Sequence, residues 1–149
     1  MRRTLAVLIV LTMAAAGLAA CGVRADGPPE IQVDRTPCSR CGMLVSEPLY
    51  AAAFQAPGSA PRVFDDIGCL RKAARAERGD VRIWVHDAAD STWLDGANAV
   101  FVASSAIHSP MGGGLLAYRD LAAAERAAAK YHGRVIRSLP ELLQMEVGS

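Results

Sequence analysis

The sequence predicts an α+β fold made of two similar small lobes, each a ββα-type unit followed by a further strand, with mainly antiparallel pairing. Two apolar runs each end in an aspartate and lead into a segment rich in helix formers. The interval from Asp66 to Gly79 is 13 positions, and the interval from Asp120 to Gly133 is the same. This weak repetition favours an internal duplication, although any two strand–helix–strand units could match by chance.

The first lobe is predicted over about residues 37–90. Its expected strand, strand, helix and strand cover residues 49–54, 63–64, 67–78 and 81–85. The loop between the first two strands is rich in proline and glycine, which indicates a hairpin. Asp65 or Asp66 is expected to cap the helix, and Gly79 is expected to follow its end.

The second lobe is predicted over about residues 91–149. Its expected strand, strand, helix and strand cover residues 97–103, 115–118, 121–132 and 134–136, and a short helix over 140–144 closes the chain. Asp120 precedes the alanine-rich helix, and Gly133 follows it. Together the lobes form one predicted domain over residues 37–149, because a chain of this length suits one compact domain or two very small lobes.

The first residues are typical of an export signal rather than of a fold. Arg2 and Arg3 precede an apolar run that ends in Leu18-Ala19-Ala20-Cys21. This pattern predicts a signal peptide over residues 1–20. Its end resembles the lipobox that lipoprotein signal peptidase cleaves, which implies a lipid on Cys21 and a tether over residues 21–36. A transmembrane anchor would need roughly 20 apolar residues, and this run is shorter.

The net charge and the number of cysteines limit the classes of function that the sequence allows. The formal net charge is +1, so the sequence shows no basic footprint for nucleic acid. Four cysteines are present, and a lipid on Cys21 leaves Cys38, Cys41 and Cys69. Three thiols cannot all pair within one chain in an oxidising compartment. At least one is therefore free, intermolecular or bound to a metal.

The segment Cys38-Ser39-Arg40-Cys41-Gly42-Met43 is the first candidate site. Two thiols at this spacing can hold one metal ion or form a disulfide, and Met43 adds a thioether. Thiolate and thioether ligands select Cu(I) over hard cations. A structural zinc site would need further ligands, for which Cys69 and His86 could be recruited. A thioredoxin-like redox site is disfavoured because Pro37 precedes the motif and no helix is expected to open there.

Two further segments carry candidate residues. His108-Ser109-Pro110-Met111 leads into three glycines, where a core methionine is less expected than a ligand, although an ordinary turn explains the composition equally well. Asp65-Asp66-Ile67-Gly68-Cys69 is interpreted mainly as a helix cap. Cys69 would lie in the first helical turn, where an exposed thiol could have a lowered pKa, while burial as a small apolar group is at least as plausible.

Five features in this order resemble the NosL family: a lipoprotein signal, Cys-x-x-Cys-Gly-Met, Phe-Asp-Asp-Ile-Gly-Cys, Trp-Leu-Asp-Gly-Ala-Asn-Ala-Val-Phe-Val and Ser-Pro-Met-Gly-Gly-Gly. The resemblance covers Cys38 to about Ile136. The family commonly has Thr-Pro-Met-Gly, where this chain has Ser109-Pro110-Met111-Gly112.

The resemblance implies a Cu(I)-binding lipoprotein that is not an enzyme and that delivers copper for maturation of nitrous oxide reductase. The implied location is the periplasmic side of a cell membrane, where a periplasmic copper-accepting component of a membrane transporter complex takes the ion. The implied ligands are Cys41, Met43 and Met111. Cys38 is a further candidate, and Cys69 and His108 are possible accessory ligands. A copper carrier for another cuproprotein, a disulfide-containing structural lipoprotein and a thiol enzyme are the alternatives.

Overall fold

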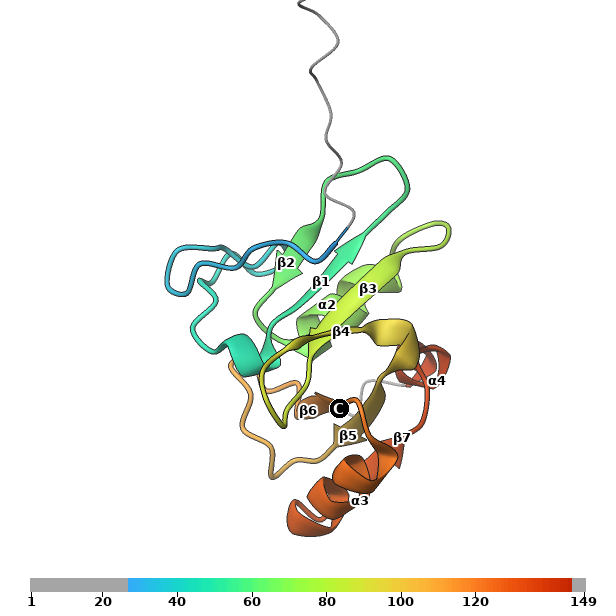
Figure 1. Cartoon of the computed structure of the whole chain (residues 1–149). Helices are drawn as coiled ribbons and strands as arrows, with labels where there is room; N and C mark the ends of the chain where they lie inside the picture. The colour runs from blue at the N-terminus through green and yellow to red at the C-terminus, as the bar shows by residue number, and fades with distance from the viewer. Residues whose placement is uncertain (1–26, 146–149) are drawn as a thin grey trace, which may run out of the picture.

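A computed structural model describes residues 27–145 (Figure 1). The predicted signal peptide over residues 1–20 and the lipidation site Cys21 lie outside the described residues. The fold is α+β with two antiparallel sheets, as the sequence predicts. Between residues 27 and 145, no helix has the length and apolar character needed to cross a membrane.

The first sheet has four strands in the order β2-β1-β3-β4. They are β1 Ala52–Gln55, β2 Arg62–Phe64, β3 Arg82–His86 and β4 Trp93–Asp95. Strand β4 was not among the predicted elements. Its pairing with β3, which joins Val85 to Leu94, depends on the tertiary fold.

The second sheet has three strands in the order β6-β5-β7. They are β5 Val100–Ala103, β6 Leu115–Tyr118 and β7 Arg134–Ile136. In each half the first strand pairs antiparallel with the two strands that follow it in sequence, β1 with β2 and β3 and β5 with β6 and β7. The predicted similarity of the two lobes is therefore present in their topology.

Two of the helices begin at their predicted aspartate caps. The described helical segments are α2 Ile67–Ala74, α3 Leu121–Lys130, α4 Leu139–Gln144 and the short 3-10 turns η2 Pro48–Tyr50 and η3 Gly96–Asn98. The side chains of Asp66 and Asp120 accept hydrogen bonds from the backbone N–H groups two residues further on. Helix α2 is shorter than predicted. Residues 75–78 bury no side chain, and helical stability in proteins comes mainly from packing.

The two halves share one hydrophobic core. Phe54 and Phe64 of the first sheet lie in the same buried cluster as Phe101 and Ile136 of the second. Helix α4 adds Leu142, which is fully buried. The halves thus bury their apolar faces against each other as well as within each lobe.

The described end of the predicted tether also contacts the fold. Ile31 packs against a small buried cluster of Val45, Ala51 and Val63. The backbone N–H of Asp34 donates to the carbonyl of Val45 at 2.8 Å. Packing against the domain therefore begins before residue 37.

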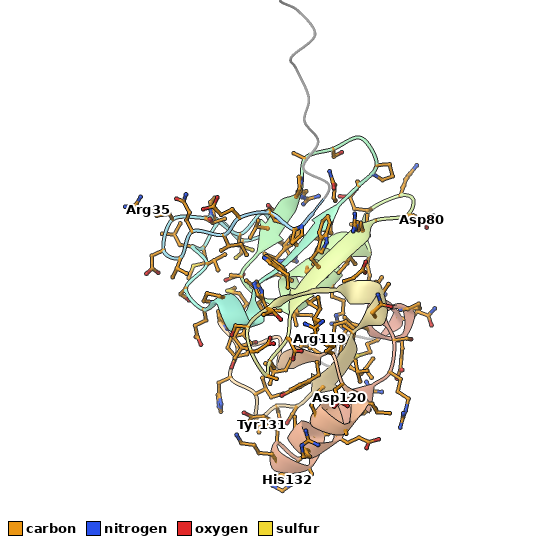
Figure 2. All side chains as sticks on the ribbon, in the orientation of Figure 1. Arg35, Asp80, Arg119, Asp120, Tyr131 and His132 are labelled. Atoms are coloured by element: carbon orange, nitrogen blue, oxygen red, sulfur yellow. The ribbon has the colours of Figure 1, made fainter. Side chains whose placement is uncertain are left out.

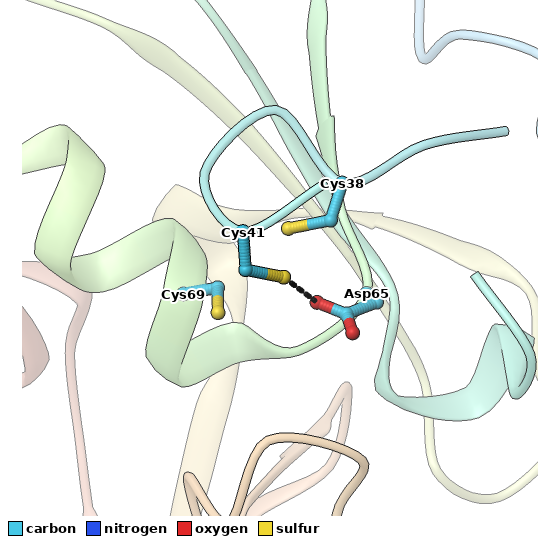
Figure 3. Close-up of side chains that lie close together, drawn as sticks. All are labelled: Cys38, Cys41, Asp65 and Cys69. Carbon is cyan, nitrogen blue, oxygen red and sulfur yellow. Dashed lines mark hydrogen bonds between the residues drawn. The ribbon is translucent and has the colours of Figure 1, made fainter. Parts of the chain in front are cut away.

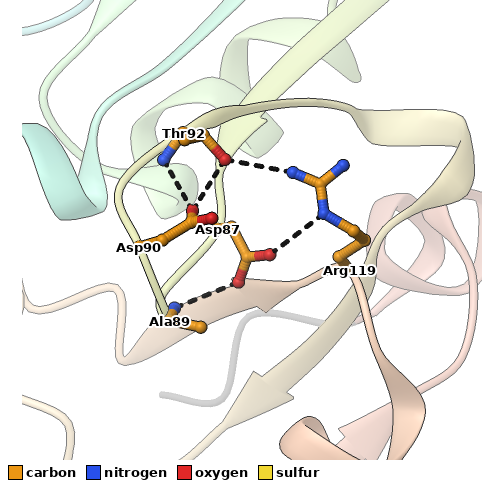
Figure 4. A network of polar contacts seen from close by, with 5 residues as sticks. All are labelled: Asp87, Ala89, Asp90, Thr92 and Arg119. Atoms are coloured by element: carbon orange, nitrogen blue, oxygen red, sulfur yellow. Dashed lines mark hydrogen bonds and ion pairs between the residues drawn. The ribbon is translucent and has the colours of Figure 1, made fainter.

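A polar network joins the loop after β3 to Arg119, which directly follows β6 (Figure 4). Asp87 is buried, accepts a hydrogen bond from the N–H of Ala89 at 3.0 Å and lies 3.5 Å from Nε of Arg119. Arg119 also donates to the hydroxyl of Thr92 at 3.0 Å. Next to this network, the N–H of Ala88 donates to the carbonyl of Ala117 at 2.8 Å, which ties the two sheets together.

Replacement of Asp87 by alanine is expected to lower the free energy of unfolding by roughly 1–3 kcal/mol, because it removes the buried carboxylate that accepts from the Ala89 N–H and pairs with Arg119. Urea denaturation measures the change. Asp80 is exposed at the edge of the molecule (Figure 2), and Asp80→Ala as the control should shift the free energy by less than about 0.5 kcal/mol. Equal effects of the two substitutions would show that the network contributes nothing to stability.

Candidate metal centre

The Cys-x-x-Cys segment forms a tight turn held against strand β2. The N–H of Cys38 donates to the carbonyl of Met43 at 2.7 Å, and the N–H of Gly42 donates to the carbonyl of Cys38 at 2.9 Å. Gly42 has a φ of 78°, a conformation that glycine adopts without strain. The N–H of Ser39 donates to the carbonyl of Val63 at 2.8 Å, which fixes the turn to the edge of the sheet.

The corner between β2 and α2 supplies two more groups. Asp65 directly follows the strand and is 1% exposed, while Asp66 caps the helix. Cys69 lies in the first turn of α2 and is 5% exposed. The turn and the corner are distant in sequence, and the hydrogen bond from Ser39 to β2 brings them together.

Cys38, Cys41, Asp65 and Cys69 point toward one another at this place (Figure 3). Their candidate ligand atoms all lie within 4.8 Å of one another. The three cysteines are free thiols, and the Cys41 thiol donates to Oδ1 of Asp65 at 3.9 Å. Cys38 and Cys69 are buried and Cys41 is accessible to solvent. We call these four residues the thiol cluster, a buried donor set with one accessible member.

Burial keeps the inner thiols protonated in the metal-free protein. It raises the pKa of the Cys38 thiol, and together with the neighbouring Cys38 and Asp65 it raises the pKa of Cys69 to about 12. The lowering expected for a thiol in the first turn of a helix is therefore outweighed by desolvation. Cys69 lacks the two properties of a reactive cysteine, exposure and a lowered pKa.

A cleft of about 590 Å³ adjoins the cluster on the side of Cys69. Its walls include Met111 and His108 from the Ser-Pro-Met loop and Arg40 from the Cys-x-x-Cys turn. Met111 is 42% exposed. The structure thus places two of the predicted ligands, Met111 and His108, in the walls of the same cleft as Cys69.

Met43 is placed differently from the thiols beside it in sequence. Its side chain is 58% exposed and is absent from the walls of the cleft.

His86 is also separate from the described thiol cluster. It is buried, its Nδ1 lies 2.9 Å from the carbonyl oxygen of Ala51, and its ring lies against Trp93. Packing accounts for His86, so the structure does not bring it to the thiols as the further zinc ligand that the sequence could have supplied.

Sequence reasoning missed Asp65 as a neighbour of the thiols and gave Cys69 only an accessory role. Asp65 was interpreted with Asp66 as a helix cap, yet only Asp66 forms the cap. A buried strand that ends in two aspartates offers a signal here, because one cap needs one carboxylate and the second must have another environment.

The fold and the cluster define a small α+β domain with a thiol-rich candidate metal site. A family model described as NosL matches residues 30–140, and the chain belongs to the NosL family. The fold is similar to that of the copper chaperone NosL from Shewanella denitrificans, with 21% sequence identity and a TM-score of 0.62 over 74% of this chain and 94% of that chain. No curated protein matches the chain significantly.

Proposed function

We propose that this protein is a periplasmic Cu(I) carrier that supplies copper for assembly of the copper sites of nitrous oxide reductase. The observation that carries the proposal is the convergence of Cys38, Cys41 and Cys69 within 4.8 Å of one another. Family membership and the fold shared with a copper chaperone support it. Binding and passing on an ion requires no catalysis, so we propose a carrier and not an enzyme.

The donor set favours Cu(I) as the cargo. Thiolates are soft ligands that select Cu(I), whereas the Asp65 carboxylate is hard and suits it poorly. We infer that the sulfur atoms hold the ion and that Asp65 stays outside the coordination sphere. Three cysteines and one carboxylate also provide four possible zinc ligands. The soft side chain of Met111 in the adjoining cleft favours copper over this alternative.

Release is as necessary to a carrier as binding. Cys41 is accessible to solvent, and Met111 and His108 lie in an open cleft next to Cys69. A soft ligand on an acceptor protein could approach the ion from this side and displace the thiolates one at a time. We propose a periplasmic component of a membrane transporter complex as the acceptor, with a lipid on Cys21 that keeps the carrier at the membrane.

Intact-mass measurement of the protein under native conditions tests the proposal. After anaerobic reduction and exposure to excess Cu(I), the mass should increase by one copper per chain. The structural alternative predicts no retained metal and a gain of two protons when a Cys38–Cys41 disulfide is reduced. Zinc in place of copper, in an equal mixture of both ions, would also overturn the proposal. A neighbouring nitrous oxide reductase gene would support the proposed target over another cuproprotein.

Copper binding is expected to release protons near neutral pH. Because the pKa values of Cys38 and Cys69 are raised, both thiols carry their protons in the free protein. Each must lose its proton to coordinate Cu(I), so the apparent affinity should rise with pH by up to roughly tenfold per pH unit for each thiol that binds. Titration of Cu(I) into weakly buffered protein measures the release. Binding without a change in pH would exclude the buried thiols as ligands.

A further inference from the structure

The Asp66 carboxylate does more than cap helix α2. One oxygen, Oδ1, accepts the hydrogen bond from the N–H of Gly68 that forms the cap. The other, Oδ2, accepts a hydrogen bond from the hydroxyl of Ser109. It also accepts from the N–H groups of Met111 and Gly113, each at 3.3 Å. The same side chain therefore joins the helix that carries Cys69 to the loop that carries Met111.

The packing around this carboxylate is closely fitted. Asp66 is 1% exposed and Ser109 is 9% exposed. A Cβ atom on Gly113 would overlap with Oδ1 of Asp66, and one on Gly68 would come within 2.9 Å of the Cα of Gly113. Glycine is required at both positions for the loop to lie against the start of the helix.

Without such an anchor the loop would have little to fix it. Glycine loses more conformational freedom on ordering than any other residue, and residues 112–114 are all glycine. Loop Ser109–Gly114 forms no strand or helix of its own. Two further bonds hold its last residue, from the N–H of Gly114 to the hydroxyl of Ser109 at 3.1 Å and from the N–H of Ser104 to the carbonyl of Gly114 at 2.9 Å. Asp66 fixes the loop at Met111 as well, because its carboxylate accepts the hydrogen bond from the Met111 N–H.

We propose that Asp66 is a positioning residue for copper: it holds Met111 at the wall of the cleft beside Cys69, so that the thioether can contribute to Cu(I) binding. The inference rests on the proposed function. Residues that orient a metal ligand through a second hydrogen bond commonly affect affinity as strongly as some ligands do. Asp66 would act through the backbone of Met111, without touching the ion.

Asp66→Asn is the most direct test, because asparagine caps a helix as well as aspartate does but replaces one acceptor oxygen with a donor. We expect Asp66→Asn to lower Cu(I) affinity about tenfold, the scale of a lost outer-shell partner. Ser109→Ala removes the hydroxyl donor and should weaken binding in the same direction, whereas Ser109→Thr keeps the hydroxyl and should restore it. Competition with bicinchoninate, on reduced protein without oxygen, measures the affinity.

The decisive comparison adds Met111→Leu. If Asp66 acts through Met111, Asp66→Asn should cause no further loss in the Met111→Leu background, a coupling that general destabilisation would not produce. Met145→Leu is the control, since Met145 lines the same cleft but is not a proposed ligand. The Met145→Leu variant should therefore bind copper with the affinity of the parent protein. Thermal unfolding of each metal-free variant checks that it folds. If Asp66→Asn does not fold, the comparison of Ser109→Ala with Ser109→Thr still tests the proposal.

The outcomes separate the two proposals. Equal losses from Asp66→Asn in both backgrounds, or parent affinity in Asp66→Asn or Met111→Leu, would overturn the positioning role while the thiol cluster could still carry copper. A parent protein that binds no Cu(I) would overturn the proposed function, and the positioning role with it.

Discussion

Replacement of Cys41 by serine is expected to weaken Cu(I) binding by more than the roughly 10–100-fold that loss of an outer-shell partner costs. Cys41 is the solvent-accessible member of the thiol cluster, and its Sγ lies 3.9 Å from Asp65 at the side from which an ion would enter. A serine hydroxyl keeps its proton at neutral pH and is a hard ligand, so it cannot replace a thiolate for Cu(I).

Ser39→Ala is a matched control for this experiment. Ser39 lies in the same turn and is exposed, and its backbone N–H, which holds the turn to Val63, is unchanged by the substitution. The control should bind Cu(I) with parent affinity in the chelator competition. If Cys41→Ser also binds with parent affinity, Cys41 is not a ligand and the proposed site is wrong.

Replacement of Cys69 by alanine should cause a loss of similar size, which distinguishes the structural site from the ligand set implied by sequence resemblance. The thiol of Cys69 lies within 4.8 Å of the other ligand atoms, and the helix that carries it is capped by Asp66. Alanine removes the sulfur without introducing a polar group at a position that is 5% exposed. The change therefore removes the candidate ligand atom and adds no polar group to the core.

The matched comparison for Cys69→Ala is Met43→Leu. Met43 is 58% exposed and stands outside the cleft, so its replacement should reduce Cu(I) affinity less than Cys69→Ala does. Both affinities are measured by the same competition, and the metal-free variants are compared by circular dichroism. A larger loss in Met43→Leu than in Cys69→Ala would favour the ligand set implied by resemblance over the thiol cluster.

Most of the fold follows from local patterns in the sequence. Strands β6 and β7 have their predicted bounds because turn residues or a helix border each of them. The aspartate caps fix where α2 and α3 begin, since one side chain satisfies an N–H at each helix start. The end of α2 and the existence of β4 were not predicted, because both depend on contacts with distant parts of the chain.

Some residues of the candidate site could likewise be predicted from local sequence, while others could not. The spacing of Cys38 and Cys41 is a local feature, so the sequence alone identified them as partners. The inclusion of Asp65 and Cys69 depends on the turn lying against β2, which no periodic pattern reveals. The second bond of Asp66 is equally hidden, because it joins residues more than forty positions apart.

X-ray absorption at the copper edge, on reduced protein loaded with one Cu(I) per chain, tests the central claim most directly. The thiol cluster predicts an ion surrounded by sulfur, with at least three sulfur neighbours and no oxygen neighbour from Asp65. Alkylation of the loaded protein should then leave Cys38, Cys41 and Cys69 protected. A coordination shell dominated by oxygen or nitrogen, or three cysteines that react freely while copper is bound, would contradict the proposed copper site.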